Sequence, residues 1–107
     1  MRTRHGELDI RSIETAPDLT GYEEERHDGR VIVGHSETGA VHVIESRTAK
    51  LYRMNGAEIA YLCLEKPEKL RHDGHRHETV EFPAGWHEVV TRRQYDEGTQ
   101  GWSKVQD

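Results

Sequence analysis

The chain is short of apolar residues and has a single cysteine. Apolar residues make up 33% of its 107 positions, and charged residues make up another 33%. A domain of this size buries only about two thirds of the surface that its unfolded chain exposes, so we expect a thin core. The lone Cys63 excludes an intrachain disulfide, and its place in the most apolar segment predicts a buried structural thiol. A thin core favours support from a partner subunit, so we expect a homo-oligomer.

Long apolar runs are also missing. The most apolar segment, Ile59–Leu64, is far too short to span a membrane. No apolar stretch follows the basic start Met1–Arg4, so no secretory signal is expected. The net charge is −5 and no basic tract stands out, which argues against passive binding to duplex DNA or anionic lipid. We therefore expect a cytoplasmic protein with no membrane partner.

What the chain does contain is a series of short segments with strand spacing, separated by turn residues. Asp28-Gly29, Ser36–Gly39 and Pro83–Gly85 are turn signals between apolar runs. Asn55-Gly56 predicts a β-hairpin with a type I′ turn. The stretch Leu19–Asp28 is either one helical turn or a loop. We predict an all-β fold, a small barrel or sandwich of about seven to eight short antiparallel strands.

The length allows a single β-rich domain over residues 1–107, and we expect loose termini at 1–6 and 97–107. The last long strand is predicted over Trp86–Tyr95. Because polar residues occur on both of its faces, this strand is expected near a sheet edge or at a site.

Histidine is the residue type that points to chemistry, with eight copies in the chain. His35 and His42 flank the turn at 36–40, and His75 and His77 lie on one side of an extended segment, with Glu81 following. Imidazoles that converge with a carboxylate suit a divalent transition metal such as zinc, nickel, iron or manganese. The alternative is that residues 71–77 form a polar surface turn that binds nothing.

Two short segments resemble the metal motifs of the cupin family. His75–Glu81 is similar to the first motif, His-x-His followed by Glu, and Pro83–His87 is similar to the second, Pro-x-Gly-x-x-His. The resemblance implies a cupin-like metal-dependent enzyme that uses His75, His77 and Glu81. The chain departs from the pattern because its second motif is one residue short and directly follows the first.

Two longer blocks resemble small uncharacterised proteins encoded by phages and prophages. The first block is Val33–Glu45, and the second runs from Phe82 through Arg92–Tyr95 to Gly101-Trp102. The resemblance implies a phage-type protein in the cytoplasm of a bacterial host, with His35, His42 and His77 as candidate ligands. Ala40-Val41 stands where those proteins carry consecutive histidines, which weakens a metal role.

Two further segments could bind an anionic ligand. The hydroxyls and backbone amides of Ser36, Glu37 and Thr38 could hold a small anion, although the same residues also make a good turn. Arg92 and Arg93 match the geometry of a phosphate, and Tyr95 could stack on a base. The alternative for that segment is an exposed strand end.

Three functions follow from these residues. The favoured one is a small phage-type accessory or binding protein, with a divalent metal held by clustered histidines as one version of it. The second is a phage counter-defence or nucleotide-binding protein that uses Arg92, Arg93 and Tyr95. The third is the cupin-like enzyme. No catalytic residue can be assigned, and the favoured function is not enzymatic.

Overall fold

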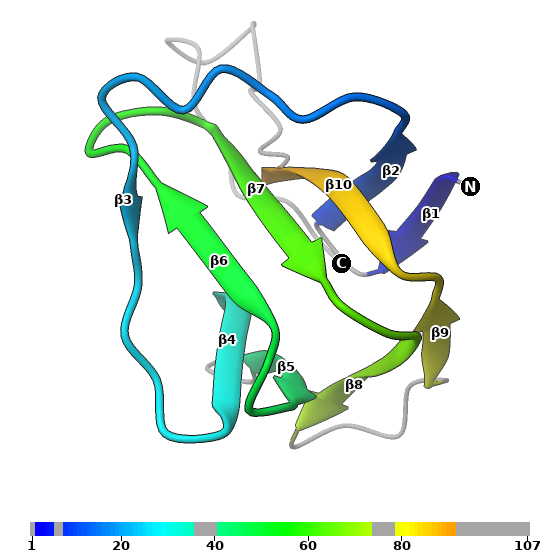
Figure 1. Cartoon of the computed structure of the whole chain (residues 1–107). Helices are drawn as coiled ribbons and strands as arrows, with labels where there is room; N and C mark the ends of the chain where they lie inside the picture. Colours follow the sequence, from blue (N-terminus) through cyan, green and yellow to red (C-terminus); the bar gives the residue numbers. More distant parts are fainter. Residues whose placement is uncertain (1, 6–7, 36–40, 74–78, 92–107) are drawn as a thin grey trace, which may run out of the picture.

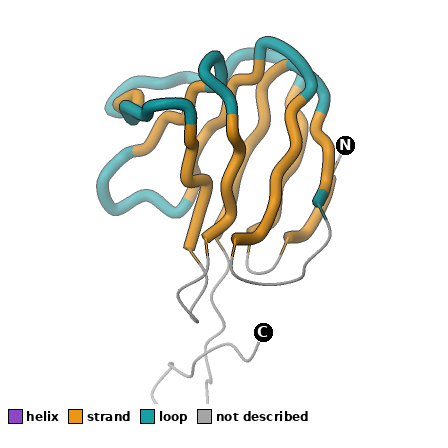
Figure 2. Tube along the Cα trace, turned by 90° about the horizontal axis from the view of Figure 1, so that it is seen from below, coloured by secondary structure: helices purple, strands orange, loops and turns teal. Residues whose placement is uncertain are grey.

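The computed structural model describes residues 2–5, 8–35, 41–73 and 79–91, and it is built from strands. Ten strands occur in these ranges, and no helix occurs among them. The strands are β1 (Arg2–His5), β2 (Leu8–Ile13), β3 (Glu23–Glu24), β4 (Arg30–His35), β5 (Val41–Glu45), β6 (Lys50–Arg53), β7 (Ile59–Leu64), β8 (Glu68–Asp73), β9 (Val80–Phe82) and β10 (Gly85–Thr91). Most of the described loops gather at one end of the strands (Figure 2).

The strands form two antiparallel sheets. The larger has six strands in the order β1-β2-β10-β7-β6-β3, and the smaller has four in the order β4-β5-β8-β9. In Figure 1 the larger sheet fills the upper part of the view and the smaller sheet the lower part. The predicted all-β fold with antiparallel strands is therefore confirmed, although the strands number ten rather than seven to eight. No hydrogen-bonded strand pair closes the described sheets into a barrel.

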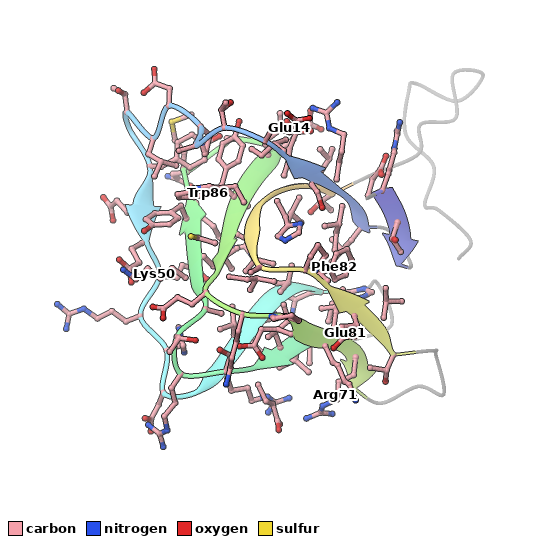
Figure 3. All side chains as sticks on the ribbon, turned by 45° about the vertical axis from the view of Figure 1, so that its right-hand side comes forward. Glu14, Lys50, Arg71, Glu81, Phe82 and Trp86 are labelled. Atoms are coloured by element: carbon pink, nitrogen blue, oxygen red, sulfur yellow. The ribbon has the colours of Figure 1, made fainter. Side chains whose placement is uncertain are left out.

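The core lies between the two sheets because strand residues alternate between an inner and an outer face. In β7 the inner residues Ala60, Leu62 and Leu64 are buried, and the residues between them are half-buried. The small sheet contributes Val31, Val33, Ile44, Leu70 and Phe82 to the same cluster. Phe82 is the largest fully buried side chain, and it lies between the sheets in Figure 3.

The hairpin predicted at Asn55-Gly56 is present. β6 and β7 pair antiparallel, with Leu51 opposite Leu62, and Gly56 has a φ of 85°. The loop is longer than the two-residue type I′ turn predicted, because β6 ends at Arg53 and β7 begins at Ile59. Within it the amide of Ala57 donates to the carbonyl oxygen of Met54 at 3.0 Å, which closes a β-turn with Asn55 and Gly56 at its centre.

Of the two alternatives predicted for the last strand, a place near a sheet edge is wrong. β10 lies inside the larger sheet, with β2 on one side and β7 on the other, not near an edge. Its polar residues have other partners: Glu88 forms an ion pair with Arg11 of β2, and the buried His87 bonds at both ring nitrogens. The strand is described to Thr91, and its predicted continuation to Tyr95 lies outside the described residues.

The stretch Leu19–Asp28, predicted as a helical turn or loop, is a loop that contains the two-residue strand β3. Among the described residues, no helix has the length and apolar character needed to cross a membrane.

Candidate functional site

The outer surface of the six-stranded sheet carries a group of half-buried aromatic and apolar side chains, which we call the aromatic face. It begins with the alternation of β7 and β10, whose outward residues are Ile59, Tyr61 and Cys63 on one strand and Trp86 and Val90 on the other. The register places Cys63 opposite Trp86 and Ile59 opposite Val90, so the two strands form one continuous surface. The complete set is Ile13, Tyr22, Tyr52, Ile59, Tyr61, Cys63, Trp86 and Val90.

The four aromatic side chains of this face form two packed pairs. Tyr52 and Trp86 have ring centroids 5.6 Å apart, and Tyr22 and Tyr61 have centroids 5.2 Å apart with planes tilted by 58°. The hydroxyl of Tyr22 donates a hydrogen bond to the carbonyl oxygen of Ile59 at 2.9 Å, which holds the loop before β3 onto the sheet. Such offset and tilted pairs fix the ring positions, so the surface is preorganised. Figure 3 shows Trp86 on this side of the molecule, with Lys50 at the margin.

The pattern that could have revealed this face is the period-two alternation in β7 and β10. Tyr61 and Trp86 alternate with the buried residues of their own strands, so they lie on the opposite face of the sheet. Sequence reasoning predicted a buried Cys63 from the apolar run at 59–64, because this run contains no charged residue to mark the outer face. Cys63 is correspondingly half-buried on the outer face rather than buried as predicted, and partial burial raises the pKa of its thiol.

The structure separates the two predicted metal ligands of β4 and β5. His35 ends β4 and is exposed, whereas His42 in β5 is fully buried on the inner face. His42 lies opposite Gly34, and His35 lies opposite Val41, so the two imidazoles are on opposite faces of the small sheet. A metal ion needs ligands that converge, and these two do not.

The third described candidate ligand, Glu81, is exposed in the edge strand β9, opposite Lys69 of β8. Figure 3 shows Glu81 and Arg71 together on the small sheet, away from Trp86. The other two candidates, His75 and His77, lie outside the described residues. Within the described part of the chain, no three His, Cys, Asp or Glu side chains form a group that could hold a metal ion.

The segments predicted to bind an anion or nucleotide also lie outside the described residues. They are Ser36, Glu37, Thr38, Arg92, Arg93 and Tyr95. Binding of an anion or nucleotide by these residues stays a prediction. Metal binding by the histidines also stays a prediction, and elemental analysis with a thermal melt before and after EDTA tests it.

His87, which belongs to the cupin-like segment, is buried and forms hydrogen bonds at both ring nitrogens. Its Nε2 donates to the carbonyl oxygen of Pro83 at 2.8 Å, which leaves Nδ1 to accept a hydrogen bond from the hydroxyl of Ser12 at 3.0 Å. Its ring packs edge-on against Phe82 at 5.5 Å. Burial lowers its pKa, and the bond to Pro83 opposes this only in part. Both nitrogens are used, so His87 acts as a neutral core residue that joins β2 to the turn before β10.

Comparison with known proteins shows to which family the chain belongs. A family model described as a domain of unknown function, DUF8820, matches residues 4–93. The chain belongs to the DUF8820 family. The match includes the whole aromatic face and every predicted metal ligand, whereas Tyr95 lies beyond it. No curated protein and no solved structure matches the DUF8820 chain. The family description assigns no activity to this domain.

Proposed function

We propose that the chain is a non-catalytic binding module that holds a partner protein on the aromatic face. The observation that supports this is where the chain places its aromatic residues. It has seven of them, and four (Tyr22, Tyr52, Tyr61 and Trp86) lie on the outer face of the large sheet, whereas Phe82 is the one in the described core.

This distribution leaves apolar surface outside the core. Only a third of the chain is apolar, and eight of those residues sit together on the outside instead of enlarging the core. Single apolar residues on a surface are ordinary, whereas a contiguous group marks an interaction site. Tyr and Trp are also the residues enriched at the centres of protein interfaces, because they offer large rigid contact areas.

The proposal agrees with the accessory or binding role favoured from the sequence and replaces the ligand residues chosen there. The phage or prophage setting implied by the resemblance stays a prediction. It bears on which cell the partner comes from, and it does not bear on which surface binds.

Photo-crosslinking in living cells tests the proposed surface. The variant Tyr52→benzoylphenylalanine places the reactive group on the aromatic face, and Glu81→benzoylphenylalanine places it on the exposed edge strand β9 as the matched control. We expect the first variant to form an adduct with another protein and the control to form none. Mass spectrometry identifies the partner, which is then purified and titrated against the full chain.

With the purified partner, Trp86→Ala should weaken binding by about tenfold or more, the range of an interface hot spot. The thermal melt of this variant shows whether its fold is retained. The proposal is wrong if both crosslinking positions give the same adducts or none, or if Trp86→Ala binds the partner as tightly as the original chain.

A further inference from the structure

Carboxylates flank the tyrosines of the aromatic face along one row of the sheet. The register places Glu24 beside Tyr52, Tyr52 beside Tyr61, and Tyr61 beside Glu88. Residues that are directly opposite on neighbouring strands have Cβ atoms only about 5 Å apart. Two phenol rings therefore lie side by side. The exposed carboxylate of Glu24 lies at one end of the pair, and the carboxylate of Glu88, ion-paired with Arg11 at 3.2 Å, lies at the other.

The charge of Glu24 acts on the Tyr52 end of this row. The pKa of Tyr52 is raised, first by partial burial and next by the charge of Glu24. Lys50 lowers the pKa of Tyr52, but by less than Glu24 raises it. Lys50 lies in the neighbouring cross-strand row, opposite Cys63. The pKa of Tyr22 is raised by burial, by Tyr61 and by Glu88. An additional negative charge is therefore disfavoured at this surface, which argues against a nucleic acid as the occupant.

The acidic character extends over the adjacent edge of the sheet. Glu23, Glu24 and Glu25 are consecutive and exposed. Glu25 forms an ion pair with Arg53, with 3.0 Å between Oε2 of Glu25 and Nε of Arg53. The three glutamates line a surface hollow together with Met54, the one exposed large hydrophobic residue in the described part of the chain. The hollow continues the aromatic face, because Glu24 and Tyr52 are cross-strand neighbours.

We propose that the aromatic face recognises a cationic segment of the partner protein, in which an arginine or lysine side chain stacks on Tyr52, Tyr61 and Trp86 between Glu24 and Glu88. The inference rests on the proposed function and adds the chemistry of the partner. A cation over an aromatic ring is attracted by the ring's negative face, and arginine is the cation found most often in this arrangement. The exposed carboxylate of Glu24 strengthens that attraction and orients the side chain, and the ion pair of Glu88 with Arg11 shows that the other end of the row accepts a guanidinium.

Three labelled peptides of about twelve residues test the inference with the full chain. They share the same apolar positions and carry Arg, Gln or Glu at all the others. Binding is measured by fluorescence anisotropy at low and high salt, and by chemical-shift changes in the amide spectrum of the labelled protein. We expect the Arg peptide to bind most tightly, to shift amides of β6, β7 and β10, and to weaken as salt screens the charges.

Two single substitutions of equal charge separate this surface from the rest of the molecule. Glu24→Gln removes a carboxylate beside Tyr52, and Glu81→Gln removes one from the exposed edge strand of the small sheet. Glu24→Gln should weaken the Arg peptide by about two- to fivefold, the range of an exposed ion pair. Glu81→Gln should leave its affinity unchanged. Both residues are exposed, so neither change threatens the fold.

The outcomes distinguish the inference from the proposed function. Equal binding of the Gln and Arg peptides at this face, with no effect of Glu24→Gln, overturns the cationic partner and leaves a protein-binding face. A crosslinked partner whose contact segment has no Arg or Lys does the same. Tighter binding of the Glu peptide, or a crosslink at Tyr52 to a second copy of this chain, also overturns the inference. Amide shifts confined to the small sheet would contradict both proposals.

Discussion

At the scale of single residues, His87 shows how a buried imidazole is accommodated in a thin core. Both of its nitrogens have hydrogen-bond partners, and a protonated ring would add a charge between two sheets of apolar side chains. Protonation would also turn Nδ1 into a donor, so the hydroxyl of Ser12 could no longer donate to it. The folded protein therefore favours the neutral form.

This preference predicts loss of stability in mild acid. The pKa of His87 is lowered from the ordinary value of 6.5, chiefly by burial, so the unfolded chain binds the proton more readily than the folded one. The contribution of His87 to stability is thus full above pH 6.5 and decreases as the pH falls from 6.5 to the folded pKa. Urea unfolding at several pH values measures it. The difference between the original chain and His87→Gln should change over this range, and a constant difference would contradict the prediction.

At the scale of elements, the bulge in β4 depends on a glycine. The pairing of β4 with β5 shifts between Ile32 and Gly34, which brings the backbone of Gly34 close to the core residue Leu8. A Cβ at position 34 would lie 2.7 Å from Cδ2 of Leu8 and 3.1 Å from Cδ1. Leu8 is fully buried, so its side chain has little freedom to move aside.

Gly34→Ala should therefore destabilise the protein by about 1–3 kcal/mol, the usual cost of overpacking a core. The control is Gly56→Ala in the hairpin loop, where the added methyl meets no atom within 4 Å and the cost comes from the positive φ alone. Urea midpoints give both values. If the cause is steric, adding Leu8→Val should recover part of the loss at position 34 and none at position 56. Equal recovery at both positions would show that the steric explanation is wrong.

The elements were largely predictable from the sequence, and their surroundings were not. Turn residues such as Asn55-Gly56 mark strand ends locally, so the all-β fold followed from the pattern. The partners of β10 are set by contacts far apart in the chain, so its interior place was not predictable. The separation of His35 from His42 depends on the register of β4 with β5, which the turn residues do not specify. A one-residue change of register would exchange the two faces of a strand, so the membership of the aromatic face depends on the register of β7 with β6 and β10.

At the scale of the whole molecule, the chain passes between the two sheets from β3 to β4, from β5 to β6, from β7 to β8 and from β9 to β10. A side chain adds a further link where β4 lies beside β6 (Figure 1), since Arg53 of β6 bonds to the backbone of β4. Its Nη2 donates to the carbonyl oxygens of Ile32 at 3.1 Å and of Val33 at 2.7 Å. The bulge in β4 interrupts regular pairing at this point, and a guanidinium satisfies carbonyls that would otherwise need a neighbouring strand.

Arg53→Met tests whether this side chain holds the sheets together. The substitution keeps a long apolar stem and removes the donors, so we expect a loss of about 1–3 kcal/mol in the free energy of unfolding, the usual value for hydrogen bonds from a charged group. The control is Arg47→Met, which breaks an exposed ion pair with Asp28 at 3.6 Å and should cost less than about 0.5 kcal/mol. If Arg53 joins the sheets, amide exchange in Arg53→Met should accelerate in β4 and β6 together, because the carbonyl oxygens of Ile32 and Val33 lose their hydrogen-bond donor. Faster exchange in β6 alone, or equal costs for the two substitutions, would mean that the core by itself keeps the sheets in place.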